Sequence, residues 1–141
     1  MLDKMIEMQA KIDALYKKLE IEIKTKKVLE EIGFSIREKG CVYLIFAVKT
    51  AGKNPNLLHQ PQLLYEEIAQ TCGVTSEEVE NEIGHSITRW RQKESLSRLN
   101  GRGNAKYGLF TGFDSTNGEF IVRLAEIVLA EKNDRYLKNS T

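Results

Sequence analysis

The sequence has few of the features that mark secreted, membrane-spanning or disulfide-linked proteins. Its only cysteines, Cys41 and Cys72, lie far apart, so we expect two small apolar side chains and no disulfide framework. Its longest apolar run, residues 41–48, is much shorter than the ~18 residues that a membrane span needs. The N-terminus is charged throughout and has no signal-peptide core. These absences predict a cytoplasmic protein with no membrane partner.

The sequence also lacks motifs for catalysis and for cofactor binding. The glycines between residues 101 and 108 do not follow the GxGxxG spacing, and no GxSxG or P-loop motif occurs. The only histidines, His59 and His85, belong to no cluster with metal-ligand spacing. We therefore expect no enzyme activity, no cofactor and no metal.

Charge of one sign is not in excess either. The 21 lysines and arginines nearly balance 20 acidic residues, which argues against a polybasic tail. A length of 141 residues predicts one domain. With 41% apolar and 29% charged residues, the composition is that of a globular protein and excludes a disordered or fibrous chain.

Residues 1–28 predict a long amphipathic helix, because every glycine and proline lies at or after Gly33. Apolar residues recur there at spacings of 4, 3, 4, 3 and 4, as in the a/d seam of a coiled coil. An isolated helix of this length is marginal in water, so the seam needs a partner. We favour a second copy of the chain; the alternative is a helix folded back on its own domain. The expected dimerisation residues are Met1, Met5, Met8, Ile12, Leu15 and Leu19.

Behind this helix, residues 29–135 predict an all-α helical bundle, followed by a tail at 136–141. We expect loops at 54–62 and 99–112, with a short extended piece possible at 107–113. Capping boxes begin at Thr75 and at Thr116. Glycines and prolines divide the remainder into expected helices at 26–32, 40–52, 63–72, 75–94 and 117–132.

Residues 64–90 have the pattern of a helix-turn-helix. Ala69 is small enough for two helices to approach, Gly73 suits the turn, and Val79 and Ile83 are spaced to point inward. In that motif the second helix enters the DNA major groove. Ordinary helical hairpins share these features, so the pattern alone leaves both interpretations open.

The outward face of the second helix offers side chains for DNA. Asn81 is suited to adenine, and His85 to a base or a phosphate. Residues 89–106 hold six basic residues and one acidic residue, which favours phosphate binding over a merely solvated loop. The glutamates at 77, 78, 80 and 82 would repel DNA phosphates; the alternative is that they only stabilise the helix through its dipole and form a solvated face. The expected DNA-binding residues are Lys39, Thr75, Ser76, Glu80, Asn81, His85, Arg89, Arg91, Arg98 and Arg102.

Several short segments occur in an order and spacing typical of one family. They are Glu31-Ile32-Gly33, Lys39-Gly40, Tyr43-Leu44, Glu67-Ile68-Ala69, Thr75, Val79-Glu80, Ile83, His85 to Ile87, Thr116-Asn117 and Glu119-Phe120-Ile121. Residues from about 30 to 131 thereby resemble the C-terminal DNA-binding domain of the sporulation-initiation response regulator of endospore-forming bacteria. The resemblance implies a helical bundle with a helix-turn-helix, double-stranded DNA as the partner, and transcriptional control through a short DNA box.

The chain departs from that family at two places. The family's receiver domain does not fit into the ~30 residues before the resemblance begins, and the coiled-coil seam stands there instead. Basic residues of the family's recognition helix are absent at positions matching Glu78, Asn81 and Gly84. We therefore predict a dimeric DNA-binding transcription regulator. The alternative is a protein-interaction module that acts on transcription machinery or antagonises a full-length regulator, with DNA binding reduced or lost.

Overall fold

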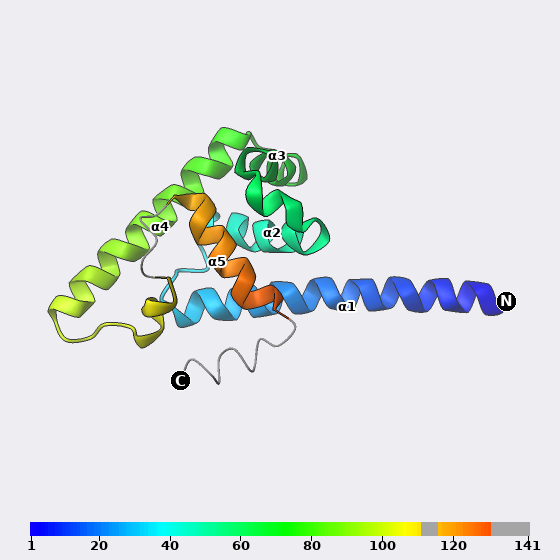
Figure 1. Ribbon diagram of the computed structural model, residues 1–141, viewed down its shortest axis with the longest axis horizontal. Helices are drawn as coiled ribbons and strands as arrows, with labels where there is room; N and C mark the ends of the chain where they lie inside the picture. The colour runs from blue at the N-terminus through cyan, green and yellow to red at the C-terminus, as the bar shows by residue number, and fades with distance from the viewer. Residues whose placement is uncertain (111–115, 131–141) are drawn as a thin grey trace.

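The computed structural model describes residues 1–110 and 116–130, and the regular structure within these ranges is entirely helical (Figure 1). The all-α prediction is therefore confirmed. The predicted tail at 136–141 lies outside the described residues. The elements are α1 (Leu2–Glu31), α2 (Lys39–Lys53), α3 (Pro61–Cys72), α4 (Ser76–Leu99) and α5 (Asn117–Leu129), with short 3-10 helices η1 (Pro55–His59) and η2 (Ala105–Phe110).

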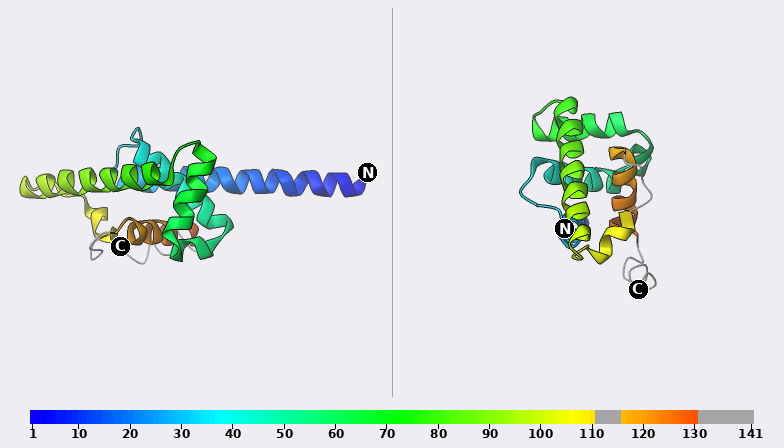
Figure 2. Two further views of the ribbon diagram at one scale, coloured as in Figure 1. Left: turned by 90° about the horizontal axis from the view of Figure 1, so that it is seen from above. Right: turned by 90° about the vertical axis from the view of Figure 1, so that its left-hand side faces the viewer.

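Helix α1 is one uninterrupted helix whose N-terminal part projects beyond the domain (Figures 1 and 2). The separate helix expected at 26–32 is only its last turns, because nothing breaks the helix before Gly33, which has φ of 102°. Residues 1–20 are exposed, whereas Val28 and Leu29 are buried in the domain. The helix is thus anchored at its C-terminal end.

Helix α2 forms the centre of the bundle and contacts each of the other four helices. Leu44, Ala47 and Val48 on it are fully buried. Cys41 is buried beside them and Cys72 is half-buried, both as free thiols. Burial raises the pKa of the Cys41 thiol to about 12, so this cysteine is an inert core residue.

Gly40 permits a close crossing of α2 and α4, because a Cβ there would overlap the carbonyl oxygen of Glu82 and the side chain of Ser86. We expect Gly40→Ala to lower the free energy of unfolding by about 1–3 kcal/mol. The matched control is Gly84→Ala on α4, whose added Cβ would meet Asn117 at an ordinary 3.5 Å. That control should stabilise the helix by roughly 0.5–1 kcal/mol. Urea unfolding of both variants measures the difference, and equal stability would contradict the tight crossing.

An aromatic cluster joins four segments that are distant in sequence. Trp90 of α4 donates its indole N–H to the carbonyl of Ile32 at 2.7 Å. Its ring stacks on Phe34 at 4.9 Å and contacts Tyr107 of η2 at 4.7 Å and Phe120 of α5 at 5.4 Å. Trp90 therefore belongs to the core, as its helical spacing predicts.

The helix starts follow the capping prediction. The hydroxyl of Thr75 accepts from the backbone N–H of Glu78 at 3.1 Å, and that of Thr116 from Glu119 at 3.2 Å. The loop predictions were less accurate. The stretch expected as a loop at 54–62 holds η1 and the start of α3, and α4 continues to Leu99 rather than 94. The extended piece was expected at 107–113. This prediction is wrong for residues 107–110, which belong to η2, and residues 111–113 lie outside the described residues.

Candidate nucleic-acid interface

Helices α3 and α4 pack against each other across a three-residue turn, residues 73–75. Gly73 ends α3 in the left-handed conformation, with φ of 69°, which allows the chain to reverse at once. Ile68 and Ala69 of α3 are buried, as are Val79 and Ile83 of α4. The apolar residues predicted to hold two helices together thus do so.

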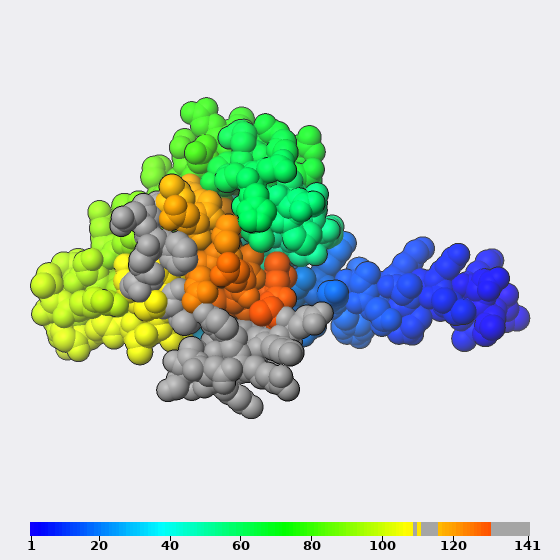
Figure 3. Space-filling view, in the orientation of Figure 1, coloured from blue at the N-terminus to red at the C-terminus, as the bar shows by residue number. Residues whose placement is uncertain are grey.

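Helix α4 lies at the edge of the molecule, and one long side of it is open to solvent (Figures 2 and 3). Its inner side carries Val79, Ile83 and Trp90, which are all buried. Successive residues of an α-helix are turned by about 100°, so Asn81 and His85 lie on the opposite side, where both are exposed. The outer side of α4 is thus available to a large partner.

Basic side chains stand on both flanks of this outer side. Arg89 and Arg91 are two residues apart and are therefore turned by roughly 200° relative to each other about the helix axis. Arg89 is half exposed, at 52% of its side chain, whereas Arg91 is half-buried and its Nη2 atom is buried. Lys39 is exposed at the first residue of α2.

Two arginines that sequence reasoning assigned to phosphates also form ion pairs within the chain. Arg89 Nε lies 3.1 Å from Glu38 Oε1; burial opposes ionisation of Glu38, but hydrogen bonding from Arg89 keeps its pKa below the usual value. Arg98 Nε lies 3.2 Å from Glu94 Oε1, and its guanidinium stacks over Tyr107 at 4.6 Å. Both arginines are therefore held in place by acidic residues, which also neutralise part of their positive charge.

Sequence reasoning missed Glu38, which lies 51 residues from Arg89 along the chain. Beside this pair is a hollow of about 220 Å³ between α4 and residues 33–38, which precede α2, and its lining also includes Lys93 and Ser86. No short-range pattern could reveal the pair, because it depends on how α2 crosses α4.

The glycine-rich loop after α4 is tied to the end of α1. Asn104 donates its side-chain amide to the carbonyl of Glu31 at 2.7 Å, and Lys106 Nζ lies 2.7 Å from the Glu31 carboxylate. The backbone N–H of Asn104 also donates to Glu94 at 2.6 Å. The loop is thus held in place. Arg102, the residue of this loop that we predict to bind DNA, is exposed to solvent.

The acidic residues at the start of α4 have structural roles. Glu78 lies within 3.4 Å of the Tyr43 hydroxyl and supplies the backbone N–H that Thr75 caps. Glu80 is exposed, and its carbonyl accepts from the side chain of Asn117 at 3.0 Å. Carboxylates at a helix N-terminus also stabilise the helix dipole.

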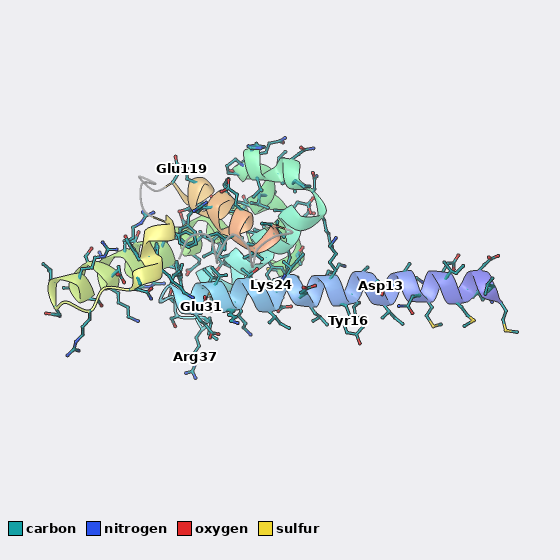
Figure 4. The ribbon with its side chains drawn as sticks, turned by 60° about the horizontal axis from the view of Figure 1, so that its bottom comes forward. Asp13, Tyr16, Lys24, Glu31, Arg37 and Glu119 are labelled. Carbon is teal, nitrogen blue, oxygen red and sulfur yellow. The ribbon has the colours of Figure 1, made fainter. Side chains whose placement is uncertain are left out.

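The seam of α1 is a second candidate surface. Its six residues, from Met1 to Leu19, are between 43% and 100% exposed, so the helix does not fold back on its own domain. Ile21, Thr25 and Val28 pack on the domain from the opposite side of the helix. Tyr16, next to the seam, points away from the domain (Figure 4).

Two other classes of site find no support in the described part of the chain. No group of three histidines, cysteines or carboxylates is arranged to hold a metal ion within residues 1–110 and 116–130. None of the helices described is both long enough and apolar enough to cross a bilayer.

Comparison with known proteins gave one family match. The family model described as "Sporulation initiation factor Spo0A C terminal" matches residues 25–128, which include the last turns of α1 and all of α2, α3 and α4. A search of curated proteins gave no match. The exposed N-terminal part of α1, with its seam, lies outside the matched region.

Proposed function

The chain belongs to the family of Spo0A C-terminal domains, which are DNA-binding effector domains of a sporulation regulator, and from that membership we propose that it binds duplex DNA as a homodimeric transcription regulator. In this proposal α3 and α4 act as a helix-turn-helix, and α4 enters the major groove. The seam of α1 joins two copies.

The observation that carries the proposal is the arrangement of polar and basic residues around α4. Asn81 and His85 are exposed along its outer side, where they can reach base edges. Arg89 and Arg91 flank them on either side of the helix, and in this proposal they contact the two phosphate backbones that border a groove. In this proposal the backbone N–H groups of the first turn of α4, which begins at Ser76, bind a phosphate as well.

The acidic start of α4 favours a second candidate function. Glu77 and Glu80 are exposed, and Glu38 already neutralises part of the charge of Arg89. A helix with this face repels phosphates near its first turns. The domain would then bind a protein, such as another regulator or the transcription machinery, and DNA affinity would be weak at every salt concentration.

A pair of variants tests the DNA-binding roles. Asn81→Ala should cost about 1–3 kcal/mol of discrimination between a preferred duplex and a random one, because it removes a base contact. Arg102→Ala should weaken binding to both duplexes alike and reduce the salt slope by about 1, because it removes a phosphate contact. Fluorescence anisotropy measures both, with Asn56→Ala on η1, which packs on α2, α3 and α5, as the control. If both variants lose discrimination equally, the assignment of roles is wrong.

A further inference from the structure

The seam of α1 has a definite heptad register. Spacings of three run from a to d and spacings of four from d to a, so the seam divides into two sets. Position a holds Met5, Ile12 and Leu19, and position d holds Met1, Met8 and Leu15. All six are exposed in the single chain, and the domain packs on the opposite side of the helix. The seam is therefore open to a second copy.

The central heptad favours two strands over three or four. It combines Ile12 at position a with Leu15 at position d. In parallel coiled coils a β-branched residue at a with leucine at d favours a dimer over a trimer or tetramer, because of how each side chain enters the facing hole. The chemistry of the seam thus fits one further copy of the same helix.

The charges beside the seam favour a parallel orientation. Position g holds a lysine in three successive heptads, at Lys4, Lys11 and Lys18, and each of them is exposed. Position e has no lysine or arginine; its residues are Leu2, Gln9, Tyr16 and Ile23. In a parallel pair g faces e of the partner helix, whereas in an antiparallel pair g faces g.

An antiparallel pair would therefore place lysines opposite lysines along one whole side. Lys18 already shares a shallow notch with Lys53 of α2, so a further lysine there would add to an existing repulsion. In a parallel pair Lys11 instead lies beside Tyr16 of the second copy, where its stem packs on the ring and its ammonium is attracted to the ring face.

We propose that α1 pairs with α1 of a second copy as a parallel, in-register coiled coil, which holds both DNA-binding domains at the same end. This inference rests on the proposed homodimer and adds its orientation. The two-fold axis then runs along the coil, and both copies of α4 can face one duplex.

Cysteine cross-linking of the full chain tests the orientation. On a Cys72→Ser background, Met5→Cys should form a disulfide-linked dimer on mild oxidation, because only residues facing each other reach the Cβ separation of about 4 Å that a disulfide needs. Cys41 stays in place, since it is buried and its thiol is inert. The matched control is Ala10→Cys at position f, outside the seam, which should cross-link about tenfold more slowly. Non-reducing gels of the oxidised protein measure both.

The other outcomes separate this inference from the homodimer itself. A tagged Leu15→Cys chain mixed with Met5→Cys should give only dimers of like chains. Mixed dimers, with no dimer from Met5→Cys alone, would show an antiparallel coil and overturn the inference while leaving the homodimer intact. A dimer by light scattering that no α1 cysteine cross-links would show that another surface pairs the chains, which also overturns it. A monomer at micromolar concentration would overturn both proposals.

Discussion

Replacing Leu15 with glutamate is expected to convert the protein to a monomer and to weaken its binding to duplex DNA by about 10²-fold or more, since the two linked sites would no longer act together. Leu15 is one of the six seam residues and is 62% exposed in the single chain. In the coil, two glutamates would face each other in an apolar interface, where unpaired charges are strongly unfavourable. Light scattering and anisotropy on the same sample measure the two effects.

The matched control is Ala10→Glu, which adds the same charge to the same helix at position f, outside the seam. It should leave the protein dimeric, with DNA affinity close to that of the unaltered chain. If the Leu15 variant remains dimeric, the seam is not the dimer interface. If it becomes a monomer but binds DNA as tightly as before, dimerisation does not contribute to DNA binding.

Replacing Trp90 with alanine is expected to have the largest effect on stability, about 3–5 kcal/mol of the free energy of unfolding. The indole fills the space between α4, η2 and α5 and satisfies the carbonyl of Ile32, so its removal leaves a cavity and an unpaired acceptor. Urea unfolding followed by circular dichroism measures the loss. A loss as large as the total stability would appear as a chain that is unfolded without denaturant.

Two further variants on α4 separate the contribution of the indole N–H to stability from that of the aromatic ring and provide a surface control. Trp90→Phe keeps an aromatic ring but removes the N–H, and it should cost about 1–3 kcal/mol. Leu96→Ala removes a side chain that is 63% exposed and should change stability by less than about 0.5 kcal/mol. If Trp90→Ala costs no more than Leu96→Ala, the aromatic cluster does not hold the domain together.

Local signals in the sequence predicted most of the fold. Helix ends at Gly33 and Gly73 were visible because glycine adopts the left-handed conformation found at both positions. The capping threonines, Thr75 and Thr116, were visible because their residue pattern spans only four residues. The loop after α4 was not predicted correctly, because its conformation depends on Glu31 and Glu94, which reach it from other helices.

The candidate site was predicted only in part. The side of α4 that carries Asn81 and His85 followed from helical periodicity alone. The partners of the arginines did not, since the pairing of Arg89 with Glu38 requires the crossing of α2 over α4 that Gly40 allows. An ion pair between residues far apart in sequence is visible only in the folded chain. The residues on one side of a helix, in contrast, follow from the sequence.

The measurement that most directly tests the central claim is anisotropy of the purified dimer against three duplexes across a salt series: the family's box, a scrambled box and a random pool. We predict that the logarithm of the affinity falls with the logarithm of salt concentration by about 0.9 for each phosphate contacted. We also predict that one duplex is preferred over the pool, because we propose that the exposed Asn81 and His85 contact base edges. A folded dimer that binds none of the duplexes at low salt would contradict the claim and favour the protein-interaction function.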